Sequence, residues 1–117
     1  MAPVRKEVKR KKFSEAQILL GKHLEELGFR EICYEYKFNA ERKWQADISA
    51  EGPKAWHGYF LFECDGGKFR GGHRRGKALE ADYERQNWAI INGFKLLRFT
   101  NEQVLKGEAK AFIERYL

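Results

Sequence analysis

Cysteine is scarce in this 117-residue chain, which contains only two, and long apolar runs are missing. The two thiols, Cys33 and Cys64, lie far apart without a CxxC spacing, so the sequence predicts neither a zinc knuckle nor a disulfide framework. No apolar run approaches the length that spans a bilayer, and none follows the basic N-terminus as in a signal peptide. We therefore expect a single-domain, soluble, cytoplasmic protein without a membrane partner.

Positive charge is concentrated in two short stretches, although the whole chain carries a net charge of +6. Residues 1–12 hold six Lys or Arg against one Glu, and residues 68–77 hold five bases and no acid. The rest of the chain is net acidic. Two local basic patches on an acidic body favour a polyanionic partner such as nucleic acid. The first stretch is equally typical of a flexible, solubilising arm, and both interpretations stay open.

Hydrophobic periodicity predicts the order helix, three strands, helix, strand and helix. Ser14 and Gln17 have capping-box spacing before the first helix, and Asn101 can cap the last. The expected helices are 14–27, 77–92 and 101–117, of which the last is interrupted or loosened at Gly107. The expected strands are 33–38, 44–50, 94–99 and a third that begins at Gly58 and leads to Glu63 and Asp65. Such an order packs naturally as an α/β sandwich around a mixed four-stranded sheet.

Alternation within the strands predicts which side chains share a face of the sheet. It places Tyr34 and Phe38 on one side of the first strand, and Ala46 and Ile48 on one face of the second. The third strand ends in two acids that also share one face, and a glycine-rich basic loop follows them directly. We therefore expect any chemistry to occur at the end of this third strand.

The hairpin between the second and third strands brings acids together. A loop centred near residue 55 pairs positions whose numbers sum to about 110, so Asp47 lies opposite Glu63 or nearly so. Directly opposed side chains have Cβ atoms roughly 4.5–5.5 Å apart, and like charges so placed repel each other. We therefore expect a positive group between them, shared with Asp65.

Three carboxylates converge in this arrangement: Asp47, Glu63 and Asp65. Their oxygens suit a hard cation such as Mg²⁺ or Mn²⁺, which in phosphodiester hydrolysis activates water and stabilises charge on the phosphate. Lys77 and Lys68 are candidates for a basic group beside the phosphate, and the sequence does not separate them. The alternative is an ordinary ion-pair network in which Arg98 or a lysine neutralises the acids.

The loop after the acids combines backbone freedom with positive charge. Its glycines allow backbone amides to approach a phosphate, and its arginines can bind phosphate oxygens without reading bases. His73 can act as a general base or donate to a phosphate, although a lone histidine often does neither. The predicted nucleic-acid-binding residues are Lys68, Arg70, Gly71, Gly72, His73, Arg74, Arg75 and Lys77.

Five segments carry a family resemblance: RKWQAD at 42–47, FECDGG at 62–67, GGHRRGK at 71–77, DYERQN at 82–87 and GFKLLRFT at 93–100. In this order they resemble the PD-(D/E)XK nuclease superfamily. Within it the chain is similar to small phage and bacterial endonuclease-like domains related to very-short-patch repair endonucleases. The resemblance covers roughly residues 13–117 and implies a restriction-endonuclease-like αβββαβα domain behind a basic arm at 1–12.

The resemblance also implies roles for individual residues. Asp47 matches the motif Asp, and Glu63 matches the Glu of Glu-x-Lys; both are metal ligands in the family. The backbone carbonyl of Cys64 is implied as a further ligand. Some members add an acid from the first helix, which Glu15 would supply here.

Asp65 stands where most of the family has a lysine, as in the repair-endonuclease-like branch, so the role of that lysine passes to Lys77 or His73. The sequence thus predicts a Mg²⁺- or Mn²⁺-dependent endonuclease that cuts DNA in repair, recombination or phage DNA processing, in a bacterial or phage-infected cell. A weak or inactive DNA- or RNA-binding module on the same fold is the first alternative, and a structural or interaction subunit is the second. Action on RNA and pairing of two copies stay open.

Overall fold

The computed structural model describes residues 13–53, 58–65 and 76–117. Its four strands form one sheet in the order β1-β2-β3-β4, in which β1, β2 and β3 are antiparallel neighbours and β4 runs parallel to β3. The elements are α2 (Glu15–Glu26), β1 (Arg30–Asn39), β2 (Trp44–Glu51), β3 (Tyr59–Asp65), α3 (Lys77–Ile91), β4 (Lys95–Thr100), α4 (Asn101–Leu105) and α5 (Glu108–Tyr116). The predicted α/β fold with a mixed four-stranded sheet is confirmed, and the predicted last helix is divided at Gly107.

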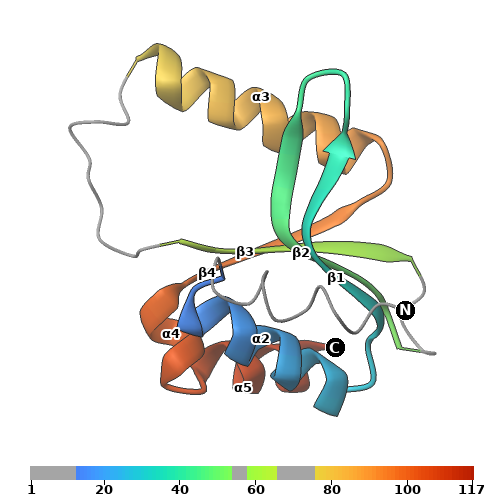
Figure 1. Ribbon diagram of the computed structural model, residues 1–117, viewed down its shortest axis with the longest axis vertical. Helices are drawn as coiled ribbons and strands as arrows, with labels where there is room; N and C mark the ends of the chain where they lie inside the picture. The colour runs from blue at the N-terminus through green and yellow to red at the C-terminus, as the bar shows by residue number, and fades with distance from the viewer. Residues whose placement is uncertain (1–12, 54–57, 66–75) are drawn as a thin grey trace.

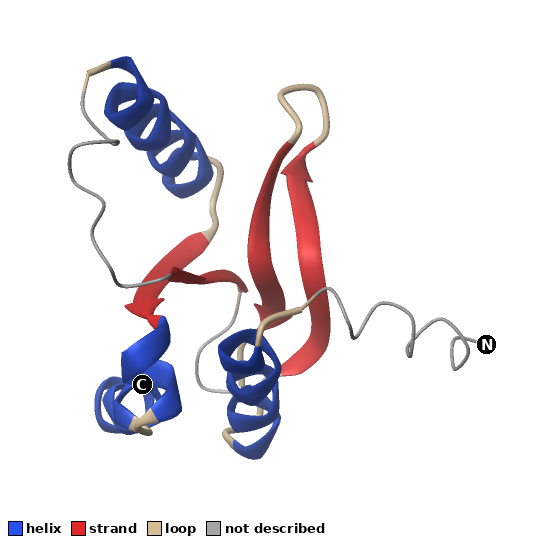
Figure 2. Cartoon of the chain, turned by 60° about the vertical axis from the view of Figure 1, so that its left-hand side comes forward, coloured by secondary structure: helices blue, strands red, loops and turns tan. Residues whose placement is uncertain are grey.

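Helices cover the sheet unequally. Figure 1 shows α2, α4 and α5 together on one side of the sheet and α3 alone on the other, and Figure 2 shows the same separation from another side. Within the described residues, no helix is long and apolar enough to cross a membrane. The sheet is therefore the middle layer, and the side chains on its two faces meet different helices.

Two hydrophobic cores follow from this layering. The larger core lies under α2, α4 and α5, and its fully buried members include Leu20, Leu24 and Phe62. The smaller one lies under α3 and centres on Leu61 and Ala89. Phe62 and Leu61 are adjacent in β3, so this strand alternates between the cores as its sequence pattern predicts.

Two predictions about strand faces are wrong. Tyr34 packs against the larger core, whereas Phe38 belongs to the smaller one, because Glu35 has a positive φ of 52° that interrupts the alternation of β1. Ala46 lies in the smaller core and Ile48 in the larger one. The β1–β2 hairpin twists away from β3 and rises beside α3 (Figure 1), so one strand supplies both cores.

Helix caps differ in part from the predicted ones. The Ser14 hydroxyl accepts a hydrogen bond from the Gln17 amide, as the capping-box spacing predicts, but the Gln17 side chain does not return to Ser14. At the last helices the predicted cap Asn101 is wrong. Thr100 is the cap instead, and it forms a complete capping box with Gln103.

Candidate functional site

The β2–β3 register brings the predicted acids to neighbouring strands. Glu51 pairs with Tyr59, and the pairing continues residue by residue to Ile48 opposite Phe62, which is the predicted register. Asp47 is the next residue of β2, so the same register sets it opposite Glu63. This position lies near the end of β3, which is followed in the sequence by the basic stretch 68–77.

Asp47 is fixed through both its side chain and its backbone. Its Oδ2 accepts a hydrogen bond from the Cys64 backbone N–H at 2.9 Å. Its carbonyl oxygen accepts one from the Gln17 side chain of α2, also at 2.9 Å, and Gln17 is only 5% exposed. Sequence reasoning assigned Gln17 to a capping box, whereas the structure uses its amide to hold Asp47. Such a preorganised carboxylate keeps its position without a ligand.

Burial raises the pKa of the Asp47 carboxyl above its ordinary value, although the Cys64 N–H acts in the opposite direction. The negative charges of Glu63, Glu35 and Asp65 raise this pKa further. Within residues 13–53, 58–65 and 76–117, no Lys, Arg or His forms an ion pair with Asp47. Its negative charge is thus poorly compensated.

Glu63, in contrast, has two arginine partners. Its residue is 6% exposed, and both of its carboxylate oxygens face the guanidinium of Arg85 from α3. Arg85 Nη1 donates to Oε2, and Nη2 donates to Oε1 at 3.0 Å. Arg98 Nε lies 3.5 Å from the same Oε1. The ion-pair alternative from the sequence is therefore present at Glu63, with Arg85 as an unforeseen partner.

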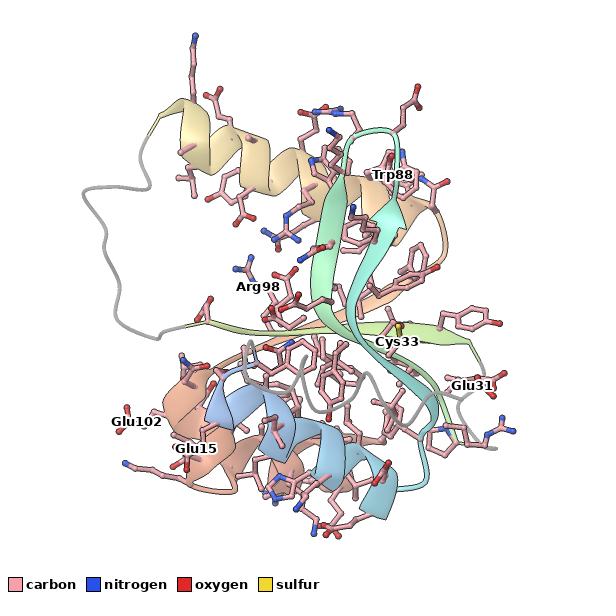
Figure 3. The ribbon with its side chains drawn as sticks, in the orientation of Figure 1. Glu15, Glu31, Cys33, Trp88, Arg98 and Glu102 are labelled. Atoms are coloured by element: carbon pink, nitrogen blue, oxygen red, sulfur yellow. The ribbon has the colours of Figure 1, made fainter. Side chains whose placement is uncertain are left out.

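Asp82 joins the two arginines in one network. It accepts hydrogen bonds from Arg85 Nη2 at 2.8 Å and from Arg98 Nη1 at 3.2 Å. Burial acts to raise the pKa of Asp82, but the two arginines together outweigh burial and lower it. Arg98 also donates to Asp65 at 3.4 Å. Figure 3 shows Arg98 on the side of the sheet that α3 covers.

A transverse row of charged residues crosses the whole sheet. Tyr34 and Tyr36 pair with Ile48 and Ala46, so Glu35 lies opposite Asp47 in β1. Glu63 follows in β3, and Arg98 is its partner in β4. The row therefore reads Glu35, Asp47, Glu63, Arg98. Sequence reasoning missed Glu35, although a β1–β2 turn centred near residue 41 predicts this pairing in the same way as the second hairpin does.

Of three other predicted site residues, Glu15 and Lys77 lie apart from this row, and Asp65 contacts its Arg98 end. Glu15 is exposed at the start of α2, and Figure 3 shows it in the helix layer, far from Arg98. Lys77 is exposed at the first position of α3 and forms no ion pair with the described residues. It precedes Arg85 by eight residues, or roughly 12 Å along the helix axis. Asp65 stays near Arg98, and its side chain is 57% exposed.

The carbonyl of Cys64, the predicted backbone ligand, lies beside the first residue of α4. With its amide nitrogen turned toward β3, Asn101 donates to the carbonyl oxygens of Cys64 at 3.2 Å and Asp65 at 3.1 Å. The remaining predicted residues lie outside the described parts of the chain: Lys68, Arg70, Gly71, Gly72, His73, Arg74 and Arg75. The basic arm at 1–12 lies outside them too.

A hard cation fits the donor set in chemistry and in charge. Among the described side chains, no three His, Cys, Asp or Glu lie close enough to hold a metal ion. Mg²⁺ does not need three, because it keeps several waters and commonly takes one or two protein carboxylates together with substrate phosphates. Asp47 and Glu63 offer such a pair, with uncompensated charge at Asp47. Arg85 faces both oxygens of Glu63, so a cation at Glu63 would compete with this guanidinium.

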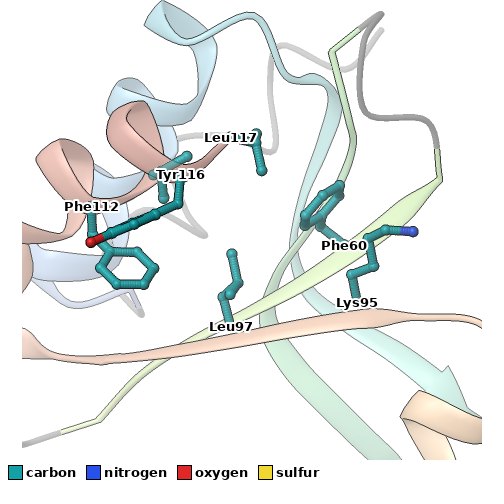
Figure 4. Close-up of a pocket in the computed structure, with 7 residues that line it drawn as sticks. Phe60, Lys95, Leu97, Phe112, Tyr116 and Leu117 are labelled. Atoms are coloured by element: carbon teal, nitrogen blue, oxygen red, sulfur yellow. The ribbon is translucent and has the colours of Figure 1, made fainter.

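A separate apolar pocket of about 210 Å³ lies on the opposite face of the sheet (Figure 4). Phe60, Leu97, Phe112 and Tyr116 line it, and Lys95 is the charged side chain among its described lining residues. Phe60 and Leu97 belong to or pack on the larger core, whereas Glu63 faces α3. The pocket is therefore not part of the carboxylate site.

Comparisons with protein-family models, with curated proteins and with solved structures find no match for this chain. The chemistry of the site is therefore argued from its own residues. They form an oxygen-rich pair on adjacent strands, partly neutralised by arginines and followed in the sequence by the basic stretch 68–77.

Proposed function

We propose that the protein is a metal-dependent endonuclease of the restriction-endonuclease-like kind, which hydrolyses DNA phosphodiester bonds with Asp47 and Glu63 as cation ligands. The observation that carries this proposal is the state of Asp47. It is held by two hydrogen bonds beside Glu63, its pKa is raised by burial, and no described cation pairs with it. Unfavourable charge kept in a fixed position is typical of functional sites.

Fold and charge distribution add support. The element order and the mixed sheet agree with the arrangement that the family resemblance implies. The acids stand at the end of β3, and the next part of the chain carries five bases without an acid at 68–77. A DNA backbone attracted by those bases would place a phosphate near the acids.

In this proposal, the residues of the site have different roles in the hydrolysis. Asp47, fixed by Gln17 and by the Cys64 amide, and Glu63 would hold Mg²⁺ or Mn²⁺ between neighbouring strands. The bound cation supplies Lewis acidity for the water and for the phosphate oxygens. Arg98 supplies a guanidinium beside the pair, suited to the negative charge of the phosphate. Lys77 and His73 stay candidates for the remaining basic group.

The second candidate function is a DNA- or RNA-binding module without catalysis. The observation that favours it is the neutralisation of Glu63 by Arg85 and Arg98, which leaves a carboxylate that needs no metal. On this alternative the arginine network only attaches α3 to the sheet. The two functions differ in whether bound nucleic acid is cut.

The test compares wild type with Asp47→Asn and Glu63→Gln on nicked, branched, duplex and single-stranded DNA and on single-stranded RNA. Each reaction contains Mg²⁺, Mn²⁺ or EDTA, and fluorescence anisotropy measures binding. Glu84→Gln is the matched control, because Glu84 is an exposed acid that pairs with Arg42 on the surface. We expect metal-dependent cutting by wild type and Glu84→Gln, and binding without cutting by the two site variants.

Two outcomes would refute the nuclease. Cutting that persists in EDTA would show that the reaction needs no divalent cation. Substrates that stay intact with Mg²⁺ and with Mn²⁺ would show that the protein is not a nuclease. Tight binding with intact substrates would establish the binding module instead. Cutting of RNA in preference to DNA would correct the substrate.

A further inference from the structure

Arg85 is the described group closest to the proposed cation ligand Glu63, and it meets the carboxylate with both terminal nitrogens. Nη1 and Nη2 donate to Oε2 and Oε1 respectively, so each carboxylate oxygen already accepts a charge-assisted hydrogen bond. The side chains of Glu63 and Arg85 are only 8% and 17% exposed, so water does not readily replace this contact. Each oxygen keeps a second lone pair, but a cation bound there would lie beside the positive guanidinium, so Arg85 opposes the binding of a cation to Glu63.

Asp82 gives Arg85 a second anchor. Arg85 Nη2 also donates to Asp82 at 2.8 Å, three residues earlier on the same helix. Asp82 accepts from Arg98 as well, so it is the common acceptor of both guanidinium groups. If Arg85 gives up one oxygen of Glu63, its contact with Asp82 keeps it beside the site.

The weak apolar packing of α3 makes this exchange feasible. Ala89 is the one described residue of α3 that is buried, and Tyr83, Ile90 and Ile91 are all exposed. Arg85 lies one turn before Ala89, so ion pairs hold the earlier part of the helix to the sheet. The first turns of α3 can therefore adjust while Trp88 and Ala89 keep their contacts in the smaller core.

We propose that Arg85 is a built-in competitor for the divalent cation: its guanidinium and the metal compete for the negative charge and the oxygens of Glu63, and Arg85 thereby lowers the metal affinity of the site. This inference rests on the proposed function, since it takes Glu63 as a cation ligand. Arg85 is a positioning residue here, because it acts through Glu63. Removing its guanidinium tightens cation binding even though no ligand is added.

The experiment measures Mn²⁺ binding by isothermal titration calorimetry, without nucleic acid, for wild type, Arg85→Met, Arg85→Lys and Arg42→Met. We expect Arg85→Met to bind Mn²⁺ about tenfold more tightly, the scale of a typical coupling between two sites. Arg85→Lys keeps the positive charge but loses the bidentate contact with Glu63, so its Mn²⁺ affinity should lie between those of wild type and Arg85→Met. It also covers the case in which Arg85→Met does not fold.

Arg42→Met is the matched control for net charge. Arg42 pairs with Glu84 of α3 at the surface, with side-chain exposures of 49% and 58%, so this change also removes one guanidinium from a helix carboxylate. Each protein is also measured with Asp47→Asn added, because Mn²⁺ bound between Asp47 and Glu63 should be lost with that change. The Mn²⁺ affinity of Arg42→Met should stay within about twofold of wild type, because exposed pairs contribute little.

The outcomes separate this inference from the proposed function. Equal Mn²⁺ affinity of wild type and both Arg85 variants, at a site that Asp47→Asn abolishes, overturns the competition and leaves the nuclease intact. Tighter Mn²⁺ binding by the Arg85 variants, without cutting of any substrate by wild type, supports the competition and refutes the nuclease. No Mn²⁺ binding by any of the proteins overturns the competition, and the cutting assay with Mg²⁺, Mn²⁺ or EDTA then decides on the nuclease.

Discussion

Arg85→Met removes the guanidinium that faces both oxygens of Glu63, while it keeps a flexible, unbranched side chain of related length. The Glu63 side chain is 8% exposed in the wild type, and Arg98 Nε at 3.5 Å would be its remaining described cation. Breaking a buried ion pair by removing one partner costs roughly 3–5 kcal/mol. Because Arg98 remains, we expect the lower end, about 3 kcal/mol less stability.

The double variant Arg85→Met with Glu63→Gln should recover much of this loss. Glutamine carries no charge that needs a partner, so the penalty for an unpaired buried carboxylate disappears. Glu63→Gln alone should cost less than Arg85→Met, because Arg85 keeps Asp82 as an acceptor at 2.8 Å. A double-mutant cycle should therefore give a coupling energy of about 2 kcal/mol, within the range for residues in direct contact.

Urea unfolding in EDTA, followed by tryptophan fluorescence, measures these free energies. Arg30→Met is the matched control, because Arg30 pairs with Glu51 at 3.3 Å and its side chain is 63% exposed. We expect it to lose no more than about 0.5 kcal/mol. Two results would refute the claim that Arg85 and Glu63 form a stabilising buried pair. One is an Arg85→Met variant as stable as Arg30→Met, and the other is a double variant whose loss of stability equals the sum of the single losses.

Two further predictions concern the same end of β3. Asp47→Asn should stabilise the metal-free protein by about 0.5–2 kcal/mol at pH 7, since asparagine accepts the Cys64 N–H bond without charge. Because the pKa of Asp47 is raised in the folded protein, its ionised form lowers the stability of the wild type above that pKa. The stability gained by Asp47→Asn should therefore vanish below the ordinary pKa of aspartate. A variant less stable than wild type at pH 7 would contradict this. For the thiols, burial and the nearby acids Asp47, Asp65 and Glu63 raise the pKa of Cys64 to about 12, whereas Cys33 is exposed. A disulfide reagent should label one thiol quickly in the native protein and the second only in urea, and two fast thiols would be the contrary result.

The fold was predictable because its signals are local. Alternation and helical periodicity give the order of the elements, and the position of the loop near residue 55 gives the register that sets Asp47 opposite Glu63. The faces of β1 and β2 were mispredicted because Glu35 has a positive φ and because the hairpin twists strongly. Neither property shows as a break in the hydrophobic pattern.

The candidate site was predictable only in part. Its acids on β2 and β3 follow from register, but the partners of those acids depend on how α3 lies across the sheet. Asp82 and Arg85 have the i,i+3 spacing of a helical ion pair, which is readable in the sequence. That spacing does not predict that the Arg85 guanidinium also contacts Glu63. Gln17 was misassigned for a similar reason, because its contact with Asp47 spans two layers of the fold.

The uneven distribution of charge across the sheet bears on the choice between a structural and a functional network. Glu35, Asp47 and Glu63 occupy one row on three neighbouring strands, and repulsion between them is a cost to folding. Arg85 and Arg98 both stand at the Glu63 end, while the described residues place no cation on Asp47. A network that only attached α3 to the sheet would gain nothing from a half-buried carboxylate on β2. Instead, Gln17 and the Cys64 amide hold Asp47 in place, as expected for a position at which a ligand completes the charge balance.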